Sequence, residues 1–384
     1  MAEKIVIFGA GATGRGHIGL LCRQAGCEVV FVDKNRSLVD ALQRAGSYRV
    51  RLYGDKTQEI EVTGFRVYYH DERERIAEEI ADAALVLTAV FDQNLPDVAQ
   101  TLALAVAQCV RRGRSGPINC VACENMVDSS SILGRHVRTL LDGKELTWCE
   151  MWMGFPDCMI SRVVPRPEPD PLVLVAEDYN EWTVRAEAFK GEKPAALTAM
   201  ELVPNQSARL ERKLFLHNGG HAVCGYVGFH RGHHYIHEAV ADPVVAEHVH
   251  EALGEIARVV EEKWGFSRDD LAAYAADFCR RGAIAEMGDQ ILRVIRDPIR
   301  KLGPRERLIG PARLAAEYGL PHRWIVRGIA AALRYNHAGD PQSVLLTSRL
   351  AHEGVAPVLD DVCALERHSL LTLEIERAYR EWRL

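Results

Sequence analysis

The strongest constraint on the fold is a glycine-rich hexapeptide near the start of the chain. Gly9, Gly11 and Gly14 fit the pattern GxGxxG, after an apolar run at residues 4–8 and before a helical pattern at residues 14–25. In such a unit the first glycine permits a tight turn, the second lets a pyrophosphate approach the backbone, and the third lets helix and strand pack closely. The hexapeptide alone recurs by chance, so the flanking strand and helix carry the argument against a sharp turn without a ligand.

An acidic residue stands where a dinucleotide site needs one. Asp33 ends the second predicted strand, 19 residues beyond Gly14, where its carboxylate accepts hydrogen bonds from the adenosine ribose hydroxyls. Its charge would repel a 2′-phosphate, which favours NAD over NADP, while Lys34 and Arg36 keep NADP as the alternative. The residues expected to bind the cofactor are Phe8, Gly9, Ala10, Gly11, Ala12, Thr13, Gly14, Arg15, Gly16 and Asp33.

Apolar runs alternate with helical patterns through roughly the first 150 residues. The runs read as strands buried on both faces, because they show no polar alternation. We expect an α/β Rossmann domain with a doubly wound, mostly parallel sheet. The predicted strands are residues 4–8, 28–32, 84–89 and 117–123, and the predicted helices are residues 14–25, 37–45 and 97–110.

The second half of the chain reads mostly as helix. Alternating prolines predict an extended connection at residues 164–172, the last strand-like runs are residues 172–175 and 182–184, and none follows about residue 194. We therefore expect an NAD-binding Rossmann domain at residues 1–192 and a mostly α-helical substrate-binding and catalytic domain at residues 193–384. The predicted helices there are residues 208–215, 243–264, 268–280, 323–335 and 365–382.

Composition excludes several classes of protein. A net charge of −6 gives no global attraction to nucleic acid or to an anionic membrane, so a small-molecule partner fits better. No apolar stretch approaches the roughly 18 residues of a membrane span, and no signal peptide is recognisable, so we expect a cytoplasmic protein. The only CxxC, Cys120 to Cys123, lacks a second ligand pair, and we predict no metal. The oligomeric state stays open, a monomer included.

A second set of polar residues is a candidate for the chemistry. At about 100° per residue, Lys213, Asn218 and His221 fall on one side of a helix. Oxidation of an alcohol by hydride transfer needs a base for the hydroxyl proton and donors for the oxygen as its charge develops. Lysine can serve as the base once burial or a neighbouring cation such as Arg212 lowers its pKa, and asparagine and histidine can serve as donors. The alternative is an exposed lysine beside satisfied core groups.

Five segments of the chain resemble the polyol-specific long-chain dehydrogenases. They are FGAGATGRGHIG, VACENMV, RVVP, ERKLFLHNGGHAVCGYVG and EYGLPH, which span residues 8–322 in family order. The resemblance implies metal-independent, NAD-dependent oxidation of a sugar alcohol phosphate, with Lys213 as general base and Asn218 and His221 holding the oxyanion. It also implies that Asn125 lies beside the nicotinamide and the substrate. Ser161 departs from the family, whose members commonly have an aspartate there.

The phosphate of such a substrate needs cationic partners. Residues 293–308 contain six lysines and arginines against two acidic residues. We expect Arg300 and Lys301 to bind the substrate phosphate, because guanidinium and ammonium groups pair with phosphate oxygens, while the alternative is a solvated surface. His233 and His237 have metal-ligand spacing but no accompanying HExxH, so packing or substrate contact is the preferred interpretation.

The sequence thus predicts an NAD-dependent dehydrogenase of a polyol phosphate. A dehydrogenase of another polyol or sugar acid in the same family is the first alternative, because of Ser161. A non-catalytic NAD-binding module is the second, and the presence of Lys213, Asn218 and His221 argues against it.

Overall fold

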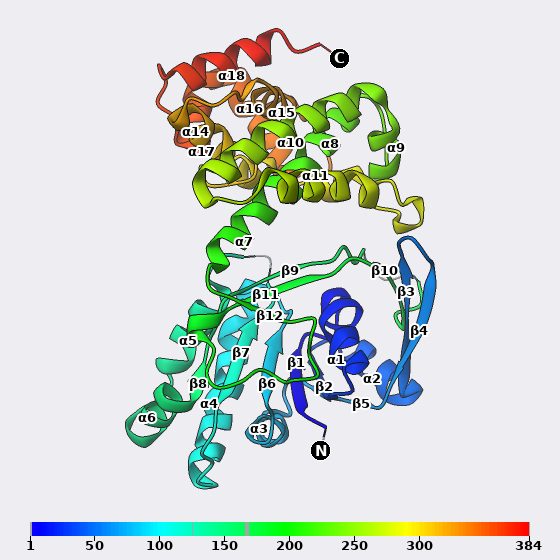
Figure 1. Cartoon of the computed structure of the whole chain (residues 1–384), viewed down its shortest axis with the longest axis vertical. Helices are drawn as coiled ribbons and strands as arrows, with labels where there is room; N and C mark the ends of the chain where they lie inside the picture. Colours follow the sequence, from blue (N-terminus) through cyan, green and yellow to red (C-terminus); the bar gives the residue numbers. More distant parts are fainter. Residues whose placement is uncertain (1, 125, 166–168, 384) are drawn as a thin grey trace. The chain divides into compact units, whose positions relative to one another are not determined.

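The structure, a computed structural model, describes residues 2–124, 126–165 and 169–383. The chain forms two compact units, Met1–Leu210 and Glu211–Leu384. The first is built around a parallel sheet and the second from helices (Figure 1). The predicted fold class is confirmed.

A six-stranded parallel sheet forms the centre of the first unit, in the order β5-β2-β1-β6-β7-β8. β1 lies in the middle, paired with β2 on one side and β6 on the other, so that Phe8 aligns with Val32 and Thr88. The carboxyl ends of three strands therefore lie together beside the glycine turn. The strands are β1 (Lys4–Phe8), β2 (Glu28–Asp33), β5 (Phe65–Tyr69), β6 (Leu85–Thr88), β7 (Ile118–Ala122) and β8 (Met153–Gly154).

Helices bury both faces of this sheet. Alternate residues of β1 belong to different cores: Val6 packs with α3 and α4, whereas Ile5 and Ile7 pack with the first helix of the chain. The strands carry apolar side chains on both faces for this reason, as the sequence indicated. The helices of this unit are η1 (Gly14–Gly19), α1 (Leu20–Gln24), α2 (Arg36–Ala45), α3 (Arg73–Ala81), η2 (Asp92–Asn94), α4 (Leu95–Arg111), α5 (Ser129–Arg138), α6 (Gly143–Trp152) and η3 (Ala186–Ala188).

Two small sheets complete the first unit. One has the order β10-β3-β4 and the other β12-β11-β9. The sequence pattern missed β3, β4, β5, β8, β9 and β12, and the expectation that no strand follows residue 194 is wrong. β12 is only three residues long and pairs in parallel with β11, so the first compact unit extends beyond residue 192. The strands are β3 (Ser47–Tyr53), β4 (Gln58–Thr63), β9 (Cys158–Ser161), β10 (Val173–Glu177), β11 (Glu181–Arg185) and β12 (Glu201–Val203).

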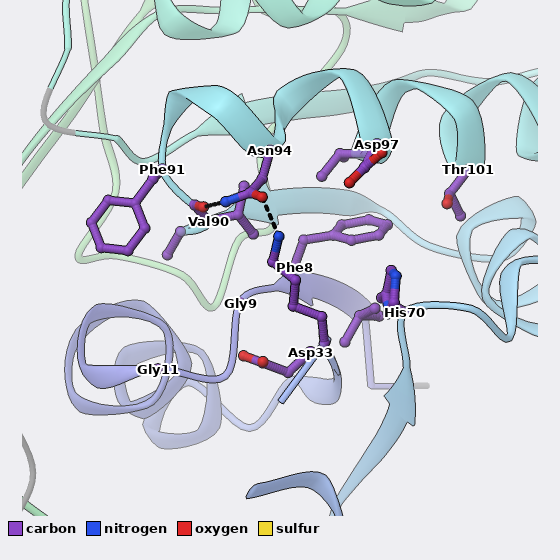
Figure 2. Close-up of a pocket in the computed structure, with 14 residues that line it drawn as sticks. Phe8, Gly9, Gly11, Asp33, His70, Val90, Phe91, Asn94, Asp97 and Thr101 are labelled. Atoms are coloured by element: carbon purple, nitrogen blue, oxygen red, sulfur yellow. Dashed lines mark hydrogen bonds between the residues drawn. The ribbon is translucent and has the colours of Figure 1, made fainter. Parts of the chain in front are cut away.

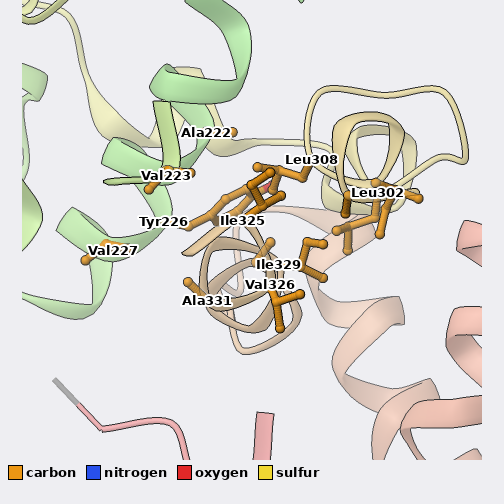
Figure 3. Packing of buried hydrophobic residues seen from close by; sticks show 14 of the residues in the cluster. Ala222, Val223, Tyr226, Val227, Leu302, Leu308, Ile325, Val326, Ile329 and Ala331 are labelled. Carbon is orange, nitrogen blue, oxygen red and sulfur yellow. The ribbon is translucent and has the colours of Figure 1, made fainter. Parts of the chain in front are cut away.

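The second unit packs its helices around α8, α10 and α15. Side chains of α8 and α15 meet in one apolar core, in which Val223 and Tyr226 lie beside Ile325 and Ile329 (Figure 3). α8 is rich in glycine because its neighbours approach closely: a Cβ on Gly225 would lie 2.4 Å from the side chain of Ile295. No helix within the described residues is long and apolar enough to span a membrane.

The five predicted helices correspond to α7 with the start of η4, α10, α11, α15 and α18, whereas α8, α9, α12, α13, α14, α16 and α17 were not predicted. α10 has the expected bounds, and α18 starts at Leu370, later than expected, because the Ser369 side chain caps it by accepting from the Thr372 amide. The helices are α7 (Gln206–Arg212), η4 (Lys213–His217), α8 (Asn218–His230), α9 (Ile236–Ala241), α10 (Pro243–Trp264), α11 (Arg268–Gly282), η5 (Ala285–Met287), α12 (Ile291–Ile295), α13 (Pro298–Lys301), α14 (Ile309–Tyr318), α15 (Arg323–Leu333), α16 (Pro341–Glu353), α17 (Val355–Cys363) and α18 (Leu370–Arg380).

Candidate functional site

A cavity of about 200 Å³ opens at the carboxyl ends of β1, β2 and β6 (Figure 2). Ligands of open α/β sheets bind at this edge. The structure brings four of the expected cofactor residues to the cavity, namely Phe8, Gly9, Gly11 and Asp33, and it adds residues that the sequence analysis did not name. These are Val32, Lys34, His70, Ala89, Val90, Phe91, Asn94, Asp97, Val98 and Thr101.

The three glycines of the turn have three different reasons to be glycine. Gly9 has φ +95°, and a Cβ there would lie 2.2 Å from the carbonyl oxygen of Ala89. A Cβ on Gly14 would lie 1.7 Å from the carbonyl oxygen of Gly9. A Cβ on Gly11 would meet no described atom within 4 Å, so this position borders open space beside the cavity. The first and third glycines are thus required by the fold, and the second leaves room for a ligand.

Asp33 is oriented by the glycine turn itself. Its Oδ2 accepts a hydrogen bond of 2.6 Å from the Ala10 amide, and its Oδ1 accepts one of 2.8 Å from the Asn35 amide. Each carboxylate oxygen keeps a further acceptor position. The carboxylate is therefore fixed at the cavity wall with capacity left for ribose hydroxyls.

The two cations next to Asp33 are engaged elsewhere. The Lys34 ammonium donates to the Asn94 side chain, and the Arg36 guanidinium pairs with Asp71 and lies 4.8 Å from the centroid of the Tyr69 ring. Both would have to leave these partners to bind a 2′-phosphate. The geometry therefore favours NAD over the NADP alternative.

Glu124 shapes the other wall of the cavity. Its Oε1 accepts from the Thr88 hydroxyl and the Val90 amide, both at 2.8 Å, and its Oε2 accepts from the Phe91 amide at 3.0 Å. Phe91 has φ 66° and ψ 151°, a conformation that strains every residue except glycine. Its ring is 72% exposed at the edge of the cavity (Figure 2). One feature of the sequence could have indicated this contact, namely a glutamate that follows a buried strand.

The remaining expected cofactor residues lie around the start of the first helix. Ala12 and Thr13 are half-buried there, and Gly16 is buried against Val164. Arg15 is 1% exposed: its amide donates to Gly11, and its guanidinium donates to the carbonyls of Ala10 and Pro171. These bonds hold the Arg15 side chain inside the protein, so it does not line the cavity. Asn125 lies outside the described residues.

In the second unit, Lys213, Asn218 and His221 lie where the backbone changes its helix type. η4 (Lys213–His217) is a π-helix, and α8 begins at Asn218. Such π segments occur frequently at functional sites. The expectation of 100° per residue assumed an α-helix throughout, so the angular position of Lys213 differs from that estimate. Lys213, Asn218 and His221 are half-buried.

His221 is a neutral imidazole in a cationic environment. Burial lowers its pKa to about 3, and the charges of Arg293, Arg281 and Arg307 act in the same direction. Its Nε2 lies 3.8 Å from Oδ2 of Asp289, too far for a hydrogen bond, while Oδ1 of that carboxylate pairs with Arg293 at 2.6 Å. A neutral imidazole carries one N–H donor, which His221 can offer to an oxygen.

His217 is a buried group that the sequence analysis missed. Its ring lies edge-on to His221, with centroids 4.7 Å apart, and its Nδ1 has no hydrogen-bond partner among the described residues. Burial lowers its pKa well below 6.5, and the charges of His221, Arg281, Lys213 and Arg307 lower it further. Lys213 is thus near enough to act electrostatically on this imidazole pair.

The expected phosphate residues lie in different environments. Lys301 is 4% exposed and donates to the carbonyl of Arg296, and burial together with Arg307 and Arg300 lowers its pKa to about 7. The Arg300 side chain is 53% exposed, with Nη1 3.9 Å from Glu306. The charge of Arg307 acts on both Lys301 and His221. Arg307 is therefore a further candidate to bind the phosphate. The sequence did not distinguish it from the other five cations of residues 293–308.

The pair with metal-ligand spacing has other partners. His233 Nε2 lies 2.9 Å from Oδ2 of Asp242, and the His237 ring stacks on Tyr235. Across the described part of the chain, no three histidine, cysteine, aspartate or glutamate side chains are arranged to hold a metal ion.

Comparisons with known proteins match both units. Residues 3–197 match the mannitol dehydrogenase Rossmann domain, and residues 207–381 match the mannitol dehydrogenase C-terminal domain. The structure of Pseudomonas fluorescens mannitol 2-dehydrogenase, a ternary complex with NAD and D-mannitol, is 16% identical, has a TM-score of 0.79, and matches over 99% of this chain and 92% of that one. Substrate-free D-sorbitol dehydrogenase is 17% identical, with a TM-score of 0.82 over 99% and 94%.

The sheet, the glycine turn and Asp33 define a Rossmann-type dinucleotide-binding protein with a helical second unit. The chain belongs to the mannitol dehydrogenase family, whose two domains together match most of its length. At these identities the solved structures support the fold.

The glycine turn yields a matched pair of variants. Gly14→Ala places a methyl group 1.7 Å from a backbone oxygen and should cost about 3 kcal/mol or more of unfolding free energy. Gly11→Ala meets no atom and should unfold as the wild type does, but it should weaken NADH binding by about tenfold or more. Thermal melts and NADH fluorescence titrations measure the two effects. Unchanged NADH affinity in Gly11→Ala would contradict the role given to that glycine.

The buried imidazoles predict a pH-dependent stability. His217 is protonated in the unfolded chain below about pH 6.5 but neutral in the folded protein, so its contribution is complete above that pH and is lost as the pH falls. Its share is up to about 1.4 kcal/mol per pH unit. Urea unfolding between about pH 7.5 and pH 5 should therefore show a shallower loss of stability in His217→Leu than in the wild type. Parallel losses would count against a neutral His217.

Proposed function

We propose that this protein is an NAD-dependent dehydrogenase that interconverts D-mannitol 1-phosphate and D-fructose 6-phosphate. The carrying observation is the set Lys213, Asn218 and neutral His221 at the π-to-α transition, in a chain of the mannitol dehydrogenase family. The chain acts on a polyol through hydride transfer. We propose further that the polyol carries a phosphate ester.

NAD is the cofactor, and this chain's residues fit it. Gly11 leaves open space beside the cavity for the pyrophosphate, and Asp33 presents a fixed carboxylate to the adenosine ribose. When bound, NAD supplies the acceptor for the hydride of the alcohol. Phe8, Ala10, Ala12, Thr13 and Gly16 contribute main-chain and packing contacts around the turn. Arg15 acts from inside, because its guanidinium holds the carbonyl of Ala10.

Lys213 takes the hydroxyl proton of the substrate. It stands on a π turn and acts electrostatically on the buried imidazole of His217, so it belongs to this cluster of polar groups. The neutral amine is the form that accepts a proton from an alcohol. Reduction of the ketone uses the same group in reverse, with the ammonium form donating.

Asn218 and His221 stabilise the oxygen from which the proton leaves. An asparagine amide and a neutral imidazole are both N–H donors. Neither is acidic enough to give its own proton to the base in place of the substrate hydroxyl. The low pKa of His221, about 3, keeps it in this donor form at neutral pH.

The phosphate binds to the cations that follow α12. Lys301 and Arg300 are the proposed ligands, and Arg307 joins them because its charge acts on both Lys301 and His221. A dianion beside Lys301 would favour its ammonium form and so raise its lowered pKa. Substrate binding and protonation of Lys301 are then coupled.

Replacing Lys213 tests the proposed base. Lys213→Met keeps the length of the side chain but removes the amine, and we expect kcat to fall by about 10²–10⁴-fold with NADH affinity unchanged. Lys263→Met, which removes a lysine paired with Glu211 in the same unit, is the control and should keep most of the activity. Near-normal turnover in Lys213→Met would remove Lys213 as the base.

A comparison of two substrates tests the phosphate. We expect kcat/KM for mannitol 1-phosphate to exceed that for mannitol by about 10²-fold or more, and Lys301→Met to lower only the value for the phosphate ester. Equal kcat/KM values of the wild type for mannitol 1-phosphate and mannitol would contradict the proposed phosphate specificity but not the proposed polyol activity.

The second candidate is a dehydrogenase of another polyol or sugar acid. Ser161 favours it, because this buried residue has replaced the aspartate common in relatives and its Oγ has no hydrogen-bond partner among the described residues. A screen of unphosphorylated polyols and sugar acids, run beside mannitol 1-phosphate, separates the two candidates.

A further inference from the structure

A cavity of about 480 Å³ lies between α15 and α18 of the second unit. None of the proposed catalytic or phosphate residues lines it. Arginines and aromatic or aliphatic side chains from both helices form its walls, together with residues that follow α18. The lining residues are His322, Arg323, Val326, Arg327, Glu374, Arg377, Ala378, Glu381, Trp382 and Arg383.

The lining carries an excess of positive charge. Four guanidinium groups face two carboxylates, and one of these, Glu374, is already paired with His322. His322 is itself cationic: its Nδ1 lies 2.8 Å from the Leu320 carbonyl and its Nε2 lies 2.8 Å from the Glu374 carboxylate, so both ring nitrogens must donate. Among the described lining residues, the other carboxylate is that of Glu381. The excess is local, because the chain as a whole has a net charge of −6.

These arginines are not neutralised by protein partners. Within the described residues, Arg323, Arg327, Arg377 and Arg383 form no ion pair, whereas surface arginines such as Arg349 and Arg367 each hold a carboxylate. Arg327 donates to the ring nitrogen of His248 and lies over the Trp324 ring, which fixes its direction but leaves its charge uncompensated. Like charges gathered in this way repel one another, and an anion in the cavity would relieve that repulsion.

The cavity also offers apolar contact. Val326, Ala378 and Trp382 line it beside the arginines, and its volume falls in the range of small-molecule sites. Free inorganic ions need no apolar wall, and a nucleic acid or an acidic peptide would meet a protein that is negatively charged overall. A small organic anion would use both kinds of lining: its charge would pair with the arginines, and its organic part would contact the apolar side chains.

We propose that the cavity between α15 and α18 is a second binding site, distinct from the site of the chemistry, for a small phosphate-bearing organic anion. The guanidinium groups of Arg323, Arg327 and Arg377 hold the phosphate oxygens, for which paired N–H donors are suited. The organic part lies against Trp382 and Val326, and the Glu381 carboxylate accepts from its hydroxyl groups. This site does not depend on the proposed substrate.

Two double variants isolate the site while removing equal charge. Arg323→Ala with Arg377→Ala removes two lining cations, and Arg313→Ala with Arg380→Ala removes two exposed arginines of α14 and α18 that do not line the cavity. Binding of inorganic pyrophosphate is measured by calorimetry on the full chain saturated with NADH, which fills the dinucleotide site. We expect a saturable component, shared by the wild type and the control, that is weakened about tenfold in the lining variant, while any binding at the cations that follow α12 stays the same in all three proteins.

Thermal melts give a second readout that a merely structural role would not move. Without ligand, the lining variant should melt no lower than the wild type, because repulsion is relieved; with pyrophosphate, the rise in Tm should be lost in the lining variant alone. Turnover of mannitol or its phosphate should be unchanged in both variants. Equal affinity in the two double variants, or no saturable component in the wild type, would overturn the proposal.

Discussion

The contact between the backbones of Gly9 and Gly14 is the constraint on which the first unit depends. The missing Cβ of Gly14 lets the first helix start against the turn, and the turn in turn presents the Ala10 amide to Asp33. The end of β1, the start of η1 and Asp33 at the end of β2 therefore hold one another in position. β1 lies between β2 and β6 and pairs with both. A substitution that pushes Gly9 and Gly14 apart would therefore displace the ends of all three strands that form the cavity.

In the second unit a different constraint dominates: the buried imidazole of His217 lies edge-on to the half-buried imidazole of His221 among cations. His217 and His221 stay neutral because charge on either would be desolvated and repelled. The apolar core under α8, with its closely packed glycines, holds these rings where water cannot stabilise an imidazolium. The proposed base, Lys213, belongs to the same cluster, because its charge is one of those that lower the pKa of His217.

The parts of the structure that sequence could predict are those with strong local signals. Strands buried on both faces, the GxGxxG turn, Asp33 and the helix at Pro243–Trp264 carry their pattern in adjacent residues. β3 and β4 belong to a small separate sheet, in which β3 is central, and were missed because both carry many polar residues; β12 was missed because three residues give no periodicity. Glu124, Asp289 and Arg307 were missed because their roles arise from partners distant in the chain. The π turn at Lys213–His217 has no simple sequence signature, so the angular estimate for Lys213 failed.

The loop that carries Phe91 has a consequence for how the chain can vary. Two hydrogen bonds, from the Val90 and Phe91 amides to the Glu124 carboxylate, fix the backbone of this loop, whatever side chain stands at position 91. Every L-amino acid there meets the same backbone penalty, and only glycine escapes it. The phenyl ring can therefore be replaced by other side chains at little further conformational cost. The chemistry of the side chain at position 91 can change between variants, while the backbone keeps it pointing the same way.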